Sequence, residues 1–269
     1  MTSDHAPSSL THELEVAGSA ATAAGAILLQ GWGTRPAARF KSSESDLVTE
    51  YDGRAEAVIV ERLAAAFPLD SLIGEEGSGR SGTSGRAWHI DPLDGTTNFI
   101  HGLPLFSISI GLCDGNRPVL GVVLAPALGW TFAGGLGLGA TWNGHKAEPS
   151  QVDRLDRALL VTGFPYIPDA PNNNIPEYVA FMRASQGVRR LGSAALDLCF
   201  VACGWLDGYW ERHIKSWDLV AGAALILAAG GSVCDPSGGP FVPETGAIVA
   251  TNGPLQAPML EILARLGSR

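Results

Sequence analysis

The run Asp91-Pro92-Leu93-Asp94-Gly95-Thr96-Thr97 places two carboxylates, a glycine and two hydroxyl groups close together. Ionised carboxylates are almost never fully buried without a partner. The apolar residues 88–90 before the run indicate the end of a β-strand. A strand that delivers two carboxylates and then turns into a helix N-terminus favours a hard cation held beside an anion. The run therefore predicts a metal-dependent site for a phosphate ester.

Further carboxylates could join this site. Glu75 and Glu76 end a short predicted strand, and Asp218 begins a predicted helix. Magnesium takes oxygen ligands, typically carboxylates, water and substrate phosphate. These acidic groups have no arginine cluster near them in the sequence, so they cannot bind a phosphate directly. They could bind two or three cations that attract it, and the amides of residues 95–97 would add donors at a helix N-terminus.

Each signal also has a simpler structural explanation. A Glu-Glu pair is usually a solvated turn, and an aspartate at a helix start, such as Asp218, is usually a cap. Asp94-Gly95 by itself is a common turn. The run 91–97, with a strand before it and a helix after it, is much less expected by chance, and it carries the prediction of a metal site.

Composition limits the classes of partner. The chain of 269 residues has a formal net charge of -9 and no run of basic residues, which argues against a nucleic-acid surface. The longest uncharged apolar stretch, residues 219–231, is shorter than the roughly 20 residues of a membrane span. The N-terminus lacks the order of a secretory signal. We therefore expect no nucleic-acid partner, no membrane partner and a cytoplasmic location.

The four cysteines support the same compartment. Cys113, Cys199, Cys203 and Cys234 are scattered in apolar surroundings. Free cysteine is among the most buried residue types, and zinc sites usually need closer spacing and a second pair. We expect reduced thiols in the core.

The remaining pattern predicts a layered α/β fold. Ala and Leu with helical spacing predict a helix over 8–31, and Thr49-x-x-Asp52 resembles a capping box before a helix over 55–67. Asn143-Gly144 predicts a β-hairpin. Strands are predicted at 71–74, 107–112, 119–124, 130–133, 159–162, 188–191, 206–211, 232–234 and 247–251, and helices at 175–184, 193–203, 217–229 and 255–266. Strands that alternate with helices indicate layers, and a seam between two halves is expected near Ser150.

Several motifs of the chain resemble those of the inositol monophosphatase family of lithium-sensitive sugar phosphatases. Residues 88–99 look like the first signature of that family, and residues 216–222 followed by 228–231 look like the second. Residues 73–76 match its strand-end glutamate motif, and Lys41 with residues 46–52 matches its flexible-loop segment. These motifs follow the order of the family and span nearly all of the chain.

The resemblance implies a compact αβαβα sandwich of the inositol monophosphatase/fructose-1,6-bisphosphatase type. Residues 1–269 would form a single phosphatase domain with two tightly packed halves, a metal-site half of about 1–150 and a substrate half of about 151–269. The resemblance also implies two or three Mg²⁺ ions and a homodimer.

The same resemblance assigns roles to individual residues. The implied metal ligands are Glu75, Asp91, the carbonyl of Leu93, Asp94 and Asp218. Thr96, hydrogen-bonded to Asp52, would orient and help to deprotonate the attacking water, and Glu76 would support the metal ligands through water. The amides of Gly95 and Thr96 would hold the phosphate. The implied contacts to the alcohol are Gly192, Ser193, Ala194 and Glu211. Lys41 would lie on the loop that helps a further metal to bind.

These features together predict a Mg-dependent phosphomonoesterase that hydrolyses inositol monophosphate or a similar small polyol or sugar phosphate. Water is expected to attack phosphorus directly, because no Ser, Cys or His stands out as an activated nucleophile. Alternative substrates on the same fold are histidinol phosphate, fructose 1,6-bisphosphate and a 3′-phosphoadenosine nucleotide, for which Arg212 and Lys215 could supply charge. An alternative of another class is a non-catalytic regulator that binds RNA or polymerase, which the acidic composition disfavours.

Overall fold

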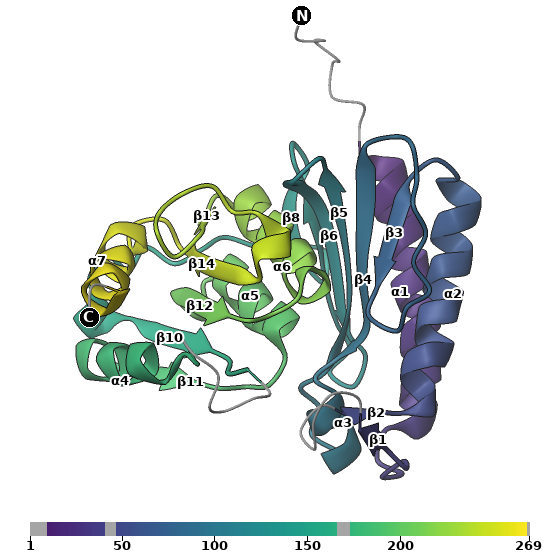
Figure 1. Ribbon diagram of the computed structural model, residues 1–269, viewed down its shortest axis with the longest axis horizontal. Helices are drawn as coiled ribbons and strands as arrows, with labels where there is room; N and C mark the ends of the chain where they lie inside the picture. The colour runs from purple at the N-terminus through teal and green to yellow at the C-terminus, as the bar shows by residue number, and fades with distance from the viewer. Residues whose placement is uncertain (1–9, 41–46, 166–172, 268–269) are drawn as a thin grey trace, which may run out of the picture.

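The computed structural model describes residues 10–40, 47–165 and 173–267, and it has five layers (Figure 1). Helices α1 (Thr11–Gly31) and α2 (Glu50–Ala66) cover the outer face of a seven-stranded sheet. Helices α5 (Ala194–Ala202) and α6 (Ser216–Ala229) lie between this sheet and a five-stranded one. Helices α4 (Ile175–Ala184) and α7 (Gln256–Gly267) cover the far face of the second sheet. The predicted αβαβα sandwich is confirmed.

The seven-stranded sheet comes from the first part of the chain. Its strand order is β3 (Ser71–Gly74), β4 (Arg86–Asp94), β5 (Ser107–Asp114), β6 (Arg117–Ala125), β7 (Trp130–Gly135), β8 (Gly139–Trp142) and β9 (His145–Lys146). Only β3 and β4 run parallel, and the other neighbours are antiparallel. The short helix α3 (Thr96–His101) follows β4 directly. The hairpin predicted at Asn143-Gly144 joins β8 to β9 and is confirmed.

The five-stranded sheet comes from the second part. Its order is β11 (Gly187–Arg189), β10 (Leu159–Thr162), β12 (Gly208–Arg212), β14 (Ala247–Thr251) and β13 (Ser232–Cys234). Strand β10 is parallel to both β11 and β12, whereas β14 is antiparallel to β12 and β13. Strands β1 (Arg39–Phe40) and β2 (Leu47–Val48) form a separate antiparallel pair, and η1 (Leu155–Arg157) and η2 (Pro243–Thr245) are short 3₁₀ turns.

Most of the predicted boundaries differ from the structure by one to five residues, and two of these differences have a clear cause. Helix α2 begins at Glu50 rather than at residue 55, because the capping box closes at Thr49, whose backbone N–H donates to Asp52 Oδ2 (2.9 Å). Apolar spacing cannot detect this polar first turn. Strand β12 begins at Gly208 rather than at residue 206, because the N–H of Leu206 donates to Phe200 O instead of joining the sheet.

Helix α6 packs against the backbone of the first sheet, and glycines make this contact possible. A Cβ on Gly121 of β6 would lie 2.1 Å from the carbonyl oxygen of Ala221, and one on Gly111 of β5 would lie 2.5 Å from the nitrogen of Ala221. Any side chain at these positions would push the helix away. The close approach brings the N-terminus of α6 toward the end of β4.

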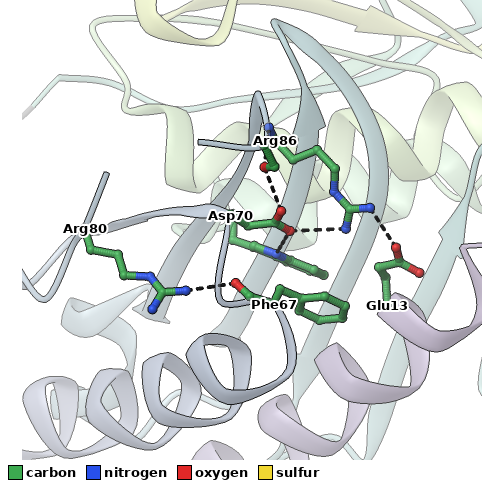
Figure 2. Close-up of polar contacts among 7 residues, drawn as sticks. Glu13, Phe67, Asp70, Arg80 and Arg86 are labelled. Carbon is green, nitrogen blue, oxygen red and sulfur yellow. Dashed lines mark hydrogen bonds and ion pairs between the residues drawn. The ribbon is translucent and has the colours of Figure 1, made fainter. Parts of the chain in front are cut away.

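A polar cluster holds the beginning of β4 (Figure 2). Asp70 accepts hydrogen bonds from Trp88 Nε1 (3.0 Å) and Ser84 Oγ (2.8 Å), and it pairs with Arg86 (3.2 Å). Arg86 also pairs with Glu13 of α1 at 2.8 Å. The buried carboxylate of Asp70 is therefore satisfied, and the cluster joins α1 to the strand that ends in the motif 91–97.

Two predictions from the sequence concern the state of the cysteines and the presence of a membrane-spanning helix. Cys113, Cys199 and Cys234 are buried, Cys203 is half-buried, and all four are free thiols. Across the described ranges, no helix combines the length and the hydrophobicity that crossing a bilayer would require.

Candidate active site

A cavity of about 430 Å³ gathers most of the predicted site residues. Its walls come from the ends of β3 and β4, the N-termini of α3, α5 and α6, and the end of β12. The predicted residues that line it are Glu75, Asp91, Leu93, Asp94, Gly95, Thr96, Gly192, Ser193, Ala194, Glu211 and Asp218. The fold thus brings together side chains from both sheets, far apart in the sequence.

Three carboxylates form the centre of this cavity. Oxygen atoms of Asp91, Asp94 and Asp218 all lie within 4.8 Å of one another. Residues three apart on a regular strand face opposite sides of the sheet. Here the pairing of β4 with β5 shifts between Asp91 and Asp94, and the N–H of Leu93 donates to Asp91 Oδ1 (2.9 Å). This bulge turns both carboxylates toward the same cavity.

Hydrogen bonds between the first sheet and α6 place Asp218. His89 Nδ1 and Ser216 Oγ share a hydrogen bond of 2.9 Å, and Ser109 Oγ donates to the carbonyl of Trp217 (2.9 Å). Burial lowers the pKa of His89 to about 4, so this imidazole is neutral at neutral pH. Asp218 also accepts from the backbone N–H of Lys215 (3.0 Å). The carboxylate therefore caps its own helix while it faces the two aspartates of β4.

Asp94 is held by the N-terminus of α5. Its carboxylate accepts hydrogen bonds from Ser193 Oγ (2.6 Å) and from the N–H groups of Ala195 (2.8 Å) and Ala194 (3.3 Å). Such donors stabilise an anion at a helix N-terminus. Ser193 and Ala194 were predicted to contact the alcohol of a substrate. The structure shows their side-chain and backbone donors bonded to the carboxylate of Asp94, a role that the sequence did not indicate.

Without a cation, the ionised forms of the clustered carboxylates are unfavourable. Burial raises the pKa of Asp91 well above its ordinary value, and the charges of Glu75, Asp218 and Asp94 raise it further. Burial likewise raises the pKa of Asp94 to about 6 and that of Asp218 well above the usual range. A cation would relieve this repulsion. An all-oxygen donor set of carboxylates suits Mg²⁺ better than zinc or copper.

The two glutamates after β3 have different environments. Glu75 lines the cavity, and its N–H donates to the carbonyl of Ile90 (3.1 Å), which fixes it beside β4. Its neighbour Glu76 is not among the described residues that line the cavity. The N–H of Glu76 donates to Glu56 Oε2 (2.8 Å), a buried carboxylate of α2.

Thr96 connects the cavity to Asp52. Thr96 Oγ lies 3.0 Å from the carbonyl of Leu93 and 3.4 Å from Asp52 Oδ1, and it can donate to either oxygen. Asp52 is fully buried and also accepts from Thr49 Oγ1 (2.6 Å). Because the single proton of the threonine points toward an acceptor, its lone pairs remain available to a molecule in the cavity.

The opposite wall contains Glu211, which is buried. Its carboxylate accepts from the hydroxyl of Tyr209 and from the N–H of Gly163, and burial raises its pKa to about 7. A Cβ on Gly163 would lie 2.3 Å from Glu211 Oε2, so a side chain at that position would force the carboxylate of Glu211 to move. Strand β12 and the residue that follows β10 thus fix the direction of this carboxylate.

Several residues of the site were not predicted by the sequence analysis, among them Gly163 and the three described next. Asn98 of α3 donates to the carbonyls of Leu105 (2.6 Å) and Leu191 (2.8 Å) and so positions the segment before Gly192. Arg190 and Asp197 line the cavity. Asp197 could have been found from its spacing after Ser193 on one helix, whereas Arg190 has no distinctive signal. Lys41 lies outside the described residues.

The comparisons with known proteins agree with one another on one family. A model of the inositol monophosphatase family matches residues 9–267. An inositol-1-monophosphatase from Synechocystis sp. is 44% identical over 261 residues, which covers 96% of this chain and 91% of the relative. A Nus factor SuhB from Pseudomonas aeruginosa is 43% identical over 214 residues, covering 77% and 79%. The solved structure of an inositol monophosphatase from Anabaena (Nostoc) sp. has a TM-score of 0.87 and 41% identity, covering 96% of this chain and 97% of that one.

Proposed function

The chain belongs to the inositol monophosphatase family and is a phosphoric monoester hydrolase, and on that basis we propose Mg-dependent hydrolysis of a small polyol or sugar phosphate. Inositol monophosphate is the first candidate, because relatives are named for it. The observation that supports the proposal most directly is the approach of Asp91, Asp94 and Asp218 within 4.8 Å inside a cavity.

The metal ligands in this proposal are Glu75, Asp91, the carbonyl of Leu93, Asp94 and Asp218, which would hold two or three ions. When bound, Mg²⁺ would supply positive charge for the phosphoryl oxygens and would make a coordinated water more acidic. The raised pKa values of the aspartates support this role, since they report a site whose negative charge lacks compensation.

Thr96 and Asp52 would orient the attacking water. A water in the cavity could donate to a lone pair of Thr96 Oγ, whose own proton points to Asp52 or to the carbonyl of Leu93. As the water attacks phosphorus, its proton would pass through Thr96 toward the buried Asp52. Glu76 would act only indirectly, through water at the metal ligands.

The substrate would lie between the two halves. The amides of Gly95 and Thr96 would hold the phosphate at the start of α3, and Gly192, Ser193, Ala194 and Glu211 would contact the alcohol. We further propose that residues 1–269 form a single phosphatase domain, with a metal-site half of about 1–150 and a substrate half of about 151–269. A homodimer, sensitivity to lithium, a role for Lys41 in binding a further ion, a cytoplasmic location and the absence of membrane and nucleic-acid partners complete the proposal.

A second candidate function is favoured by one finding. Several relatives are named Nus factors, including the protein from Pseudomonas aeruginosa, which suggests a role in an RNA-containing complex. The net charge of -9 and the assembled carboxylate cluster favour the phosphatase.

The deciding experiment measures phosphate release from inositol 1-phosphate, histidinol phosphate, fructose 1,6-bisphosphate and a 3′-phosphoadenosine nucleotide, with and without Mg²⁺. We expect Mg-dependent turnover that is fastest with inositol 1-phosphate. Asp94→Asn should lower turnover by at least about 100-fold, since loss of one well-placed site group commonly costs about 3 kcal/mol. Salt-dependent RNA binding without turnover of any ester would reject the proposal in favour of the second candidate.

A further inference from the structure

Asp197 is a buried carboxylate that the reaction described above does not use. It is the only charged side chain of α5, and it is 2% exposed. Its Oδ1 is buried and has no hydrogen-bond partner. A buried acceptor without a partner costs free energy and is rare in folded proteins. A leucine or an alanine, as at the neighbouring positions of α5, would avoid that cost.

The place of Asp197 in the fold connects it with the alcohol side of the cavity. It follows Ala194 and Ser193 by three and four positions, so the three side chains lie on the same face of α5, one turn apart. Asp197 lines the same cavity as Glu211. The charges of Asp94 and Glu211 both act on it.

Little positive charge balances the carboxylates of Asp197 and Glu211. Two cationic residues, Arg190 and Lys215, line the cavity, and the charge of Arg190 acts on both Asp197 and Glu211. Both are exposed to solvent, so their charges are screened. The inner wall of the cavity therefore offers carboxyl oxygens rather than cationic groups. Such a wall suits a ligand that donates several hydrogen bonds and disfavours one with a second phosphate.

We propose that Asp197, beside Glu211, binds a hydroxyl group of the alcohol part of the substrate and thereby selects polyhydroxylated phosphate esters. This inference rests on the proposed phosphatase function and assigns a specificity-determining residue to the same site. It also disfavours fructose 1,6-bisphosphate and 3′-phosphoadenosine nucleotides.

The test compares two esters with the same six-membered ring. Inositol 1-phosphate has ring hydroxyl groups and cyclohexyl phosphate has none. The measured quantity is the ratio of kcat/KM for the first ester to kcat/KM for the second, in saturating Mg²⁺. We expect Asp197→Ala to lower this ratio by about ten-fold or more, the effect of one hydrogen bond to a charged group. Asp197→Asn, which keeps the size of the side chain, should lower it by a smaller factor.

A matched control is available on α4. Glu177 is also a buried carboxylate with one oxygen that lacks a hydrogen-bond partner, and it pairs with Arg212 at 3.5 Å. It is not among the described residues that line the cavity. Glu177→Ala should therefore keep the ratio of the wild type.

Thermal unfolding separates binding from a structural role. Because none of the described residues donates a hydrogen bond to Asp197 Oδ1, we expect Asp197→Ala not to lower the Tm by more than a few degrees. A lower Tm with an unchanged ratio would show that Asp197 only balances the charge of Arg190 and would overturn the inference. An unchanged ratio in both variants with an intact Tm would overturn it as well. If the wild type hydrolyses neither ester, the proposed function itself fails, a result distinct from a loss of selectivity.

Discussion

The substitution Asp91→Asn tests whether the carboxylate cluster is built for a cation. In the protein without metal, oxygen atoms of three aspartates lie within 4.8 Å of one another, and Asp91 is 2% exposed. Asparagine has nearly the same shape, and its oxygen can still accept from the N–H of Leu93. The substitution therefore removes one negative charge and leaves the packing in place.

The size of the effect follows from the geometry. At an effective dielectric of about 20, two unit charges 4.8 Å apart repel each other by about 3 kcal/mol. For a chain of this length, about 3 kcal/mol should raise Tm by roughly 6–12 °C.

The difference in stability between Asp91→Asn and the wild type depends on pH. A carboxyl group whose pKa is raised by folding binds more protons in the folded state than in the unfolded state. Its contribution to stability is complete below a pH of about 4 and is lost as the pH rises through the folded pKa. For Asp94 this window runs from about 4 to about 6, and burial places the pKa of Asp91 well above 3.8. Asp91→Asn should therefore match the wild type near pH 4 and exceed its stability at pH 8.

The assay is thermal unfolding at several pH values, in EDTA and in MgCl₂, together with phosphate release. In EDTA at pH 8 we expect a higher Tm for Asp91→Asn than for the wild type. In MgCl₂ we expect the wild type to gain about 3 kcal/mol at one hundred times its Kd, and the variant to gain much less and to lose activity. Asp114→Asn, at an exposed position of β5, is the matched control and should change neither quantity. A lower Tm of Asp91→Asn in EDTA at pH 8 would refute the reasoning.

Three further substitutions address positioning and stability. Ser216→Ala removes the hydrogen bond to His89 that holds the start of α6, and it should raise the Mg²⁺ concentration needed for half-maximal activity several-fold while kcat at saturation changes little. Gly163→Ala would place a Cβ 2.3 Å from Glu211 Oε2, so KM for a polyol phosphate should rise at least about ten-fold, as measured by steady-state kinetics. Asp70→Ala leaves buried donors without an acceptor and should cost about 3 kcal/mol in urea unfolding, with activity at 25 °C retained; an unchanged midpoint would contradict this.

Local patterns were sufficient for much of the fold. The capping box at Thr49 and Asp52, the hairpin at Asn143-Gly144 and the strand–turn–helix order around residues 91–97 depend on neighbours in the sequence, so the residue types predict them directly. The metal-site candidates were visible for the same reason. Carboxylates at element ends cannot be buried at low cost, and so they mark a site.

Residue types and their spacing were enough to indicate which side chains could bind metal and which elements carry them. How these residues meet depends on contacts between elements that are distant in the chain. The register shift of β4 that turns Asp91 and Asp94 to one side depends on pairing with β5, and the hydrogen bond from Ser193 to Asp94 joins residues far apart in the chain. The orphan oxygen of Asp197 could not be predicted, because whether a polar atom has a partner depends on the packing of every element around it.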